Sequence, residues 1–137
     1  MAKQNGLAWA TMSVDDSAGT PQAIINDFTN IAWTTPRAVQ DVTGLNKSAI
    51  ERILNLADFS FTGNGVFNSA ASQSHDVFKT VPSTSVNRTV TIVTSGTAKT
   101  LACETLFTDY QLTRAASGEF TWSVPGVLAD GTVPTWS

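Results

Sequence analysis

The clearest strand pattern in this chain is SVNRTVTIVTSGTAKTLACETLFTDYQLTRAASGEFTWSV, residues 85–124. Polar and apolar residues alternate along much of it, and Ser-Gly-Thr at 95–97 supplies a turn. A period of two that is interrupted by short turn sequences is typical of antiparallel strands. The pattern predicts strands at about 86–94, 98–114 and 118–124, which form a three-stranded meander.

The strand predicted at 98–114 has apolar residues on both faces. They fall into two sets of opposite parity: Leu101, Cys103 and Phe107 in one, and Leu106, Tyr110 and Leu112 in the other. A solvated sheet face is polar, so we expect both faces to be covered. Two explanations stay open, because one strand cannot decide between them. The second set contacts another subunit, or a bulge switches the register midway.

The first half of the chain predicts further strands. LAWATMSV at 7–14 ends at a turn sequence, and ADFSFTGNGVF at 57–67 alternates Phe59 and Phe61 with polar residues. The stretch 23–35 is extended, but its apolar residues do not keep a period of two. This irregularity predicts a bulge or two short strands.

Two helices are predicted between these strands. The apolar residues of SAIERILNL recur at helical spacing, and Ser48 and Glu51 have the spacing of a capping box. This segment predicts the main helix, at about 46–56. A shorter helix is expected at 74–81, with Ser74 as its cap.

The composition agrees with a mainly β fold. Of the 137 residues, 42% are hydrophobic and only 14% are charged, and Thr and Ser supply much of the polarity. Thr, together with Val, Ile and Phe, favours the half-buried surface of a sheet. The length predicts a single domain, residues 1–137.

The distribution of charged residues limits the kinds of molecule that the protein is expected to bind. The formal net charge is −3, and Lys and Arg are scattered singly, so we expect no sequence-specific binding of nucleic acid. The N-terminal sequence lacks the apolar core of a signal peptide, and no run approaches the ~18 apolar residues of a membrane helix. We expect that the chain is made in a cytoplasm and does not associate with a membrane.

No residue pattern points to catalysis. The one cysteine, Cys103, lies in a predicted strand, and the one histidine, His75, lies in a distant polar segment. A nucleophile needs a neighbouring base, which this spacing does not provide. Phosphate-loop, dinucleotide and nucleophile-elbow motifs are absent from the sequence. We therefore expect no enzyme activity, no metal and no cofactor.

The tryptophans divide into two groups. Trp9, Trp33 and Trp122 lie in predicted strands and are expected in the core. Trp136 is the penultimate residue, and nothing follows it that could cover it within its own element. We expect a C-terminal arm at 125–137 that Trp136 anchors on this subunit or on a neighbouring one.

Three segments make the chain similar to a known family. They are FTNIAWTTPRAVQDVTGLNKSAIERILNLADFSFTGNGVFN (28–68), SHDVFKTVPSTSVNRTVTI (74–92) and LFTDYQLTRAASGEFTWSVPGVLADGTVPTW (106–136). The most specific part is DYQLTR, followed by EFTWSVPG and ADGTVPTW. Over residues 23–137 the sequence resembles the major tail protein, or tail tube protein, of long non-contractile-tailed bacteriophages.

The resemblance implies an antiparallel β-sandwich or barrel-like fold with one flanking helix, assembled as hexameric rings that stack into a tube. It implies that DNA passes through the lumen from capsid to host without sequence-specific binding. It also implies a location in the virion tail, synthesis in the host cytoplasm, and tape-measure, terminator and distal tail proteins as partners. The family has no catalytic residues to transfer.

Placed on this sequence, the flanking helix is 46–56, and the irregular stretches 36–47 and 63–74 are candidates for contacts between rings. Terminal arms are expected at 1–6 and 125–137. The candidate subunit-interface residues are Pro125, Pro134, Trp136, Leu106, Tyr110 and Leu112. An excess of carboxylates over cations is expected to keep the lumen from gripping DNA.

Other interpretations remain open. A tail terminator, a tail completion protein or a head decoration protein can share a small β fold and ring symmetry, but a terminator stops at one ring. A carbohydrate-binding β-sandwich would be a monomer in which Trp33 or Trp136 stacks on sugar rings. The state of assembly distinguishes these possibilities.

Overall fold

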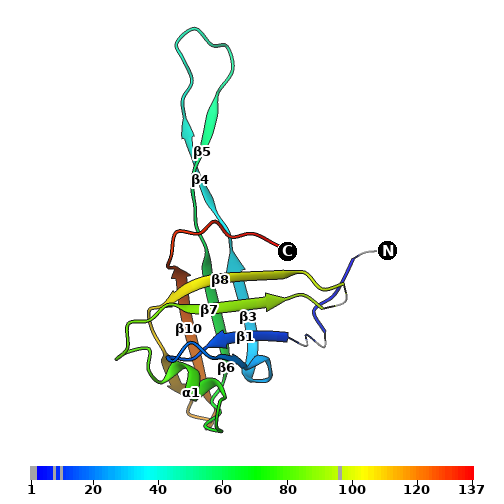
Figure 1. Cartoon of the computed structure of the whole chain (residues 1–137), viewed down its shortest axis with the longest axis vertical. Helices are drawn as coiled ribbons and strands as arrows, with labels where there is room; N and C mark the ends of the chain where they lie inside the picture. Colours follow the sequence, from blue (N-terminus) through cyan, green and yellow to red (C-terminus); the bar gives the residue numbers. More distant parts are fainter. Residues whose placement is uncertain (1–2, 8, 10, 96) are drawn as a thin grey trace.

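The computed structural model describes residues 3–7, 9, 11–95 and 97–137, so residues 1 and 2 of the predicted N-terminal arm 1–6 lie outside the described residues. The strands are β1 (Thr11–Asp15), β2 (Pro21–Ala23), β3 (Phe28–Thr34), β4 (Arg37–Asp41), β5 (Arg52–Ala57), β6 (Ser60–Val66), β7 (Arg88–Val93), β8 (Thr100–Phe107), β9 (Gln111–Arg114) and β10 (Phe120–Leu128). One α-helix, α1 (Ser74–Phe78), and one turn of 3-10 helix, η1 (Ile25–Asp27), complete the described elements (Figure 1).

Eight strands form one antiparallel sheet in the order β2-β1-β7-β8-β10-β6-β3, and β9 pairs with β10 off this path. The sheet folds into two layers that cross one another, with β1, β7 and β8 in one and β3, β6 and β10 in the other (Figure 1). The core consists of Met12, Val14, Ile24, Phe59, Phe61, Val77, Phe78, Val90, Ile92, Leu101, Cys103, Phe107, Trp122 and Val124. This arrangement confirms the predicted mainly antiparallel, sandwich-like fold.

The predicted meander is confirmed in outline. β7 and β8 pair from Val93 and Thr100 to Arg88 and Thr105, and their buried residues alternate with less buried ones. The strand predicted at 98–114 is interrupted after Phe107. Its two parts, β8 and β9, pair with successive stretches of β10.

The interruption switches the register, which is the second of the two explanations that the sequence left open. Residues opposite one another in an antiparallel pair share a face of the sheet. Phe107 lies opposite Gly126, and Leu112 lies opposite Trp122, four residues before Gly126 on β10. Odd positions of β8 and even positions of β9 therefore project to the same side, and this accounts for Leu112. It does not account for Leu106, which lies opposite Val127 and projects to the other side.

Pro125 lies inside β10, so the C-terminal arm predicted at 125–137 begins later than expected, after Leu128. Proline has no backbone N–H and is tolerated in a sheet where a ladder hydrogen bond is missing. The neighbouring edge is interrupted at 108–110, and there the Thr108 N–H donates to the Pro125 carbonyl at 3.2 Å. The proline and the interruption thus occupy the same place in the ladder.

The strands of the first half lie largely where they were predicted. β1 overlaps the stretch 7–14, and β6 lies within 57–67. The register between β3 and β6 shifts between Phe28 and Asn30, which confirms the predicted irregularity in 23–35.

The short helix α1 forms within the predicted stretch 74–81, although Gln73 rather than Ser74 is its N-cap. A buried arginine holds it against the sheet: Arg88 of β7 donates from its guanidinium to the Val77 carbonyl at 2.7 Å. A buried guanidinium is stable in such a place only when its N–H groups have partners. The bond therefore ties the position of the helix to β7.

The helix predicted at 46–56 is wrong. The second half of this segment is strand β5, and residues 42–51 form the loop that joins β5 to β4. β4 and β5 are antiparallel, with Val39 opposite Leu54. The helical spacing is a local signal, whereas the ladder to β4 satisfies the backbone through a partner earlier in the chain. Pairing with a distant segment overrides the local pattern.

Close packing on β6 depends on a residue without a side chain. A Cβ at Gly65 would overlap the Asp27 carbonyl oxygen and the Trp122 ring. Trp122 is 1% exposed, and its indole N–H donates to the Val66 carbonyl at 2.9 Å. The indole can approach the strand this closely only because position 65 is glycine.

We expect Gly65→Ala to destabilise the fold by about 1–3 kcal/mol or more, because a rigid backbone carbonyl cannot move away from the new methyl group. Equilibrium urea unfolding measures the loss. Gly6→Ala is the matched control, since the nearest atom to its Cβ would be 3.7 Å away, at ordinary contact distance. Equal stability of the two variants would contradict this account of Gly65.

Candidate functional site

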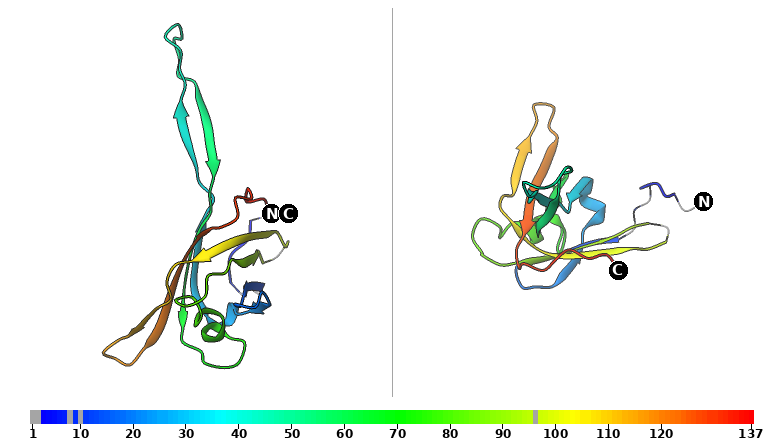
Figure 2. Two further views of the ribbon diagram at one scale, coloured as in Figure 1. Left: turned by 60° about the vertical axis from the view of Figure 1, so that its left-hand side comes forward. Right: turned by 90° about the horizontal axis from the view of Figure 1, so that it is seen from above.

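The most prominent feature outside the core is the two-stranded ribbon β4–β5, which projects from the sheet (Figures 1 and 2). We call residues 37–57 the projecting hairpin. It continues the β3–β6 pair: the Asp58 N–H donates to the Pro36 carbonyl at 3.0 Å, and Arg37 then pairs with Ala57. The β3–β6 pair therefore contributes to the core, and β4 and β5 extend the same two chain segments away from the core.

The projecting hairpin exposes apolar side chains along its length. They are Val39, Val42, Leu45, Ile50, Ile53, Leu54 and Leu56. Leu45 at the tip is 109% exposed, and Leu56 near the base is 90% exposed. A two-stranded hairpin alone is marginally stable in water, and clustered exposed apolar residues mark interaction sites. The hairpin thus has the character of a docking element.

One acidic residue orders the loop at the tip. Asp41 accepts hydrogen bonds from the Thr43 hydroxyl at 2.6 Å and from the Thr43 N–H at 2.9 Å, and these two bonds lower the pKa of the Asp41 carboxyl. The Glu51 N–H donates to the same hydroxyl at 2.8 Å, and the Glu51 carboxylate pairs with Lys47 at 3.2 Å. Both ends of the loop 42–51 are thereby tied together.

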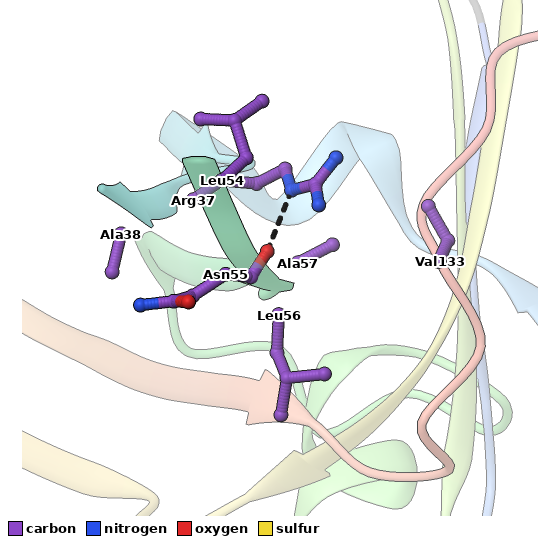
Figure 3. A pocket seen from close by; sticks show the side chains of 7 residues that line it. All are labelled: Arg37, Ala38, Leu54, Asn55, Leu56, Ala57 and Val133. Atoms are coloured by element: carbon purple, nitrogen blue, oxygen red, sulfur yellow. Dashed lines mark hydrogen bonds between the residues drawn. The ribbon is translucent and has the colours of Figure 1, made fainter. Parts of the chain in front are cut away.

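A groove lies at the base of the projecting hairpin, beside the C-terminal segment (Figure 3). It has a volume of about 690 Å³ and is lined by Arg37, Ala38, Leu54, Asn55, Leu56, Ala57 and Val133. The Arg37 Nε donates to the Asn55 carbonyl at 2.9 Å, which fixes the guanidinium on one wall. Figure 3 shows Val133 across the gap from Leu56 and Ala57. We call this the basal groove.

The C-terminal segment docks on its own subunit. Ser137 and Thr100 exchange two backbone hydrogen bonds of 2.9 and 3.0 Å, and Trp136 forms an antiparallel bridge with Leu101. The segment therefore extends the ladder of β8 beyond the end of β10. Pro134 within it is half-buried.

Three tryptophans form a row at this end of the molecule. Trp33 packs on Trp136, with ring centroids 6.4 Å apart, and on Trp9, with centroids 6.2 Å apart. Trp122 lies in the core as predicted, whereas Trp9 and Trp33 are only partly buried against it. Trp136 remains 45% exposed, so part of its surface is free for a further contact.

The remaining predicted interface residues occupy different surroundings. Leu106, Leu112 and Pro125 are exposed. Tyr110 is half-buried, and its hydroxyl lies 3.2 Å from His75 Nδ1. Burial, with a smaller effect from a nearby carboxylate, raises the pKa of Tyr110 to about 12. Tyr110 thus packs within the subunit and is not part of the same exposed surface as Leu106.

The outward strand positions of the layer formed by β3, β6, β9 and β10 hold no charged residue. The outward positions of β3, β6, β9 and β10 are Asn30, Ala32, Thr34, Ser60, Thr62, Asn64, Val66, Gln111, Thr113, Thr121, Ser123, Pro125 and Val127. We call these positions the neutral face. Hydroxyl, amide and small apolar groups make it up, so it offers a phosphate neither a cation that would bind it nor a carboxylate that would repel it.

The cysteine and the acidic residues do not form a reactive or metal-binding group among the described residues. Cys103 is buried, and burial, with the charge of Asp130, raises the pKa of its thiol. Among the described residues no three or more His, Cys, Asp or Glu side chains are grouped so as to hold a metal ion. A membrane-spanning helix is likewise not found in the described part of the chain, where none is long and apolar enough.

Sequence reasoning placed the contacts between rings at 36–47 and 63–74. The first stretch is the β4 half of the projecting hairpin, and the second begins in β6 and ends at the start of α1. The partner strand β5 was missed. The sequence held only a weak signal for it, the turn-forming Thr43-Gly44, because neither flanking stretch alternates strictly in polarity.

The projecting hairpin can be tested as an independent extension of the fold. Replacing residues 38–56 by Asn-Gly leaves Arg37 and Ala57, which pair directly, joined by a two-residue turn. We expect the melting temperature to stay within about 4 °C of the wild type, because the removed residues contribute no core side chain. Thermal unfolding followed by circular dichroism measures it. A fall of more than about 10 °C would mean that the hairpin supports the core.

Comparison with known proteins shows which solved structures share this fold. No protein-family model matches the sequence, and no curated protein matches it at a significant level. The structure is similar to a chain from the tail of an empty gene transfer agent particle, refined with helical C6 symmetry, with a TM-score of 0.76, 16% identity and 98% of each chain covered. It is also similar to a chain of the native gene transfer agent virion, with a TM-score of 0.69, 17% identity, and 97% of this chain and 99% of that chain covered. The chain therefore has the fold of these tail-particle subunits.

Proposed function

We propose that this chain is a structural subunit of a phage-type tail tube, in which copies form rings, hexameric by our expectation, that stack around a DNA channel. The observation that carries the proposal is the projecting hairpin. A fold shared with subunits of a C6-symmetric tail bears an extension whose apolar residues stay exposed in the single chain. In stacked rings these apolar residues would be buried against a neighbouring subunit, so the extension would serve as a contact between rings.

Ring closure has a physical basis in the free sheet edges. β3 pairs with β6, and β9 pairs with β10, and neither pairs on its other side within the described residues. Both strands flank the same layer. An exposed edge is a liability for a soluble chain, and joining edge to edge around a closed ring removes it. Leu112 of β9 would then lie at the contact between neighbouring subunits.

The neutral face is our candidate for the lining of the channel. DNA binding strengthens with the number of phosphates that cations neutralise, so a surface without cations lets a duplex slide. The sequence led us to expect carboxylates there, and the neutral face would achieve weak binding by a different route. The subunit would be made in the host cytoplasm and located in the virion tail. Its partners would be its own copies and the tape-measure, terminator and distal tail proteins.

Carbohydrate binding is the second candidate, because Trp9, Trp33 and Trp136 gather at one end. The Trp9 and Trp33 rings meet edge to face, at 77°, and those of Trp33 and Trp136 are tilted by 47°. A sugar ring stacks on an open aromatic face, whereas these rings cover one another in part. The row therefore fits internal packing better than a sugar platform.

Electron microscopy of the purified chain across a concentration series, with light scattering alongside, tests the proposal. We expect hollow tubes or stacked rings that lengthen as concentration rises. Single rings that never stack would assign the chain to the terminator class. A monodisperse monomer at every concentration, even after addition of preformed tail ends, would overturn the tube proposal.

The C-terminal segment provides a test at a single residue. We expect Trp136→Ala to reduce tube formation, because the exposed part of the indole would contact a neighbouring subunit. Trp136→Phe keeps an aromatic ring against Trp33 and should retain more assembly. Thermal unfolding of both variants separates loss of the internal contact from loss of assembly. Normal tubes with Trp136→Ala would remove this residue from the interface.

A further inference from the structure

We propose that the basal groove of one subunit receives the tip of the projecting hairpin of a second copy of this chain in the adjacent ring, with Leu45 as the inserted side chain. The inference rests on the proposed function and deepens it, because it names the surface on which the hairpin docks. It makes the two ends of one hairpin complementary to each other.

The tip is built to present an apolar side chain. Leu45 is 109% exposed, and it lies in a loop whose ends are tied by the hydrogen bonds of Asp41, Thr43 and Glu51. A loop that is already ordered loses little conformational entropy when it binds. The full exposure of Leu45 means that nearly all of its surface is available for burial in a contact.

The basal groove offers hydrocarbon on opposite walls. Leu56 and Ala57 of β5 lie on one side, and Val133 of the C-terminal segment lies across the gap from them (Figure 3). The Arg37 Nε donates to the Asn55 carbonyl at 2.9 Å, which holds the guanidinium at the rim. The groove has a volume of about 690 Å³, which is more than one side chain fills and is enough for the end of a loop. Leu54, Leu56, Ala57 and Val133 supply apolar surface against which an apolar loop could pack.

The occupant must come from another copy. From Arg37 to Leu45 the chain advances eight residues, which at about 3.3 Å per residue places the tip roughly 26 Å from the base. The tip therefore cannot reach the groove of its own subunit. A copy displaced by about that distance along the hairpin would have its groove at the height of the tip. Such a head-to-tail contact repeats without closing, as a stack of rings requires.

The contact would also involve the C-terminal segment. Val133 has no strand ladder of its own, but the segment is fixed on either side of it: the Ala129 N–H donates to the Glu104 carbonyl at 2.9 Å, and Ser137 pairs with Thr100. The second wall of the groove therefore exists only while this segment is docked. Hairpin binding and docking of the segment should stabilise each other.

Cysteine pairs test the contact. In the Leu45→Cys, Val133→Cys double variant, mild oxidation should link each subunit to the next, and a non-reducing gel should show a ladder of multimers. Each single variant should give dimers at most, and a mixture of the two single variants should give a cross-linked dimer. The native Cys103 is buried and should not take part. Ile50→Cys with Val133→Cys is the matched control, because Ile50 lies in the same loop and is also exposed.

The outcomes separate this inference from the proposed function. Tubes by electron microscopy without a ladder, or an equal ladder from the Ile50 pair, would overturn the tip–groove contact and leave the tube proposal intact. A ladder without rings or tubes in the wild type would support the contact and count against the tube.

A second pair of variants covers the case in which the cysteines disturb assembly. We expect Leu45→Glu to raise the concentration needed for stacking by roughly tenfold to a hundredfold, since the buried leucine is lost. Adding Leu56→Lys should recover part of that loss by placing a cation opposite the new carboxylate. Unchanged stacking with Leu45→Glu alone would overturn the proposal.

Discussion

The fold depends on the contact between the Trp122 indole and the bare backbone at Gly65. The indole N–H is satisfied by the Val66 carbonyl, and the ring packs on Phe28, at 4.9 Å between centroids, and on Phe78, at 5.3 Å. These partners come from β6, β3 and α1, so one side chain of β10 holds together the layer and the helix that covers it. Burial of so large a ring makes it a main source of stability.

The same layer explains why the molecule extends beyond its core. β3 and β6 pack around Trp122, and the hydrogen bond from Asp58 to Pro36 links their ladder to the separate ladder of β4 and β5. The projecting hairpin is thus attached at its base to a strand pair of the core, although its tip is exposed. A docking element held in this way keeps its direction, and pre-organisation of this kind lowers the entropic cost of assembly.

How far the sequence predicted the structure follows from the range of the interactions involved. Residues of β7, β8 and β10 alternate between buried and exposed because one face of each strand borders the core. This alternation can be seen in the local sequence of each strand. The helix at 46–56 was wrong because its backbone is satisfied by β4, a partner that local spacing does not reveal. Trp136 was predicted to anchor a C-terminal arm, but the sequence could not show where, because its bridge to Leu101 of the same chain is a tertiary contact. The basal groove was beyond prediction, because its walls come from β5 and from the C-terminal segment.

The low charge of the chain can be explained by considering each of its surfaces in turn. A monomer that stays in solution gains from a charged, patch-free exterior. Here the outward strand positions of one layer are neutral, a hairpin exposes leucines and isoleucines, and the outer edges of β3 and β9 are unpaired within the described residues. Each of these features is a disadvantage for an isolated subunit and would be removed in the proposed assembly, where copies surround one another. The surface chemistry of the single chain is therefore what the proposed tube would require of its subunit.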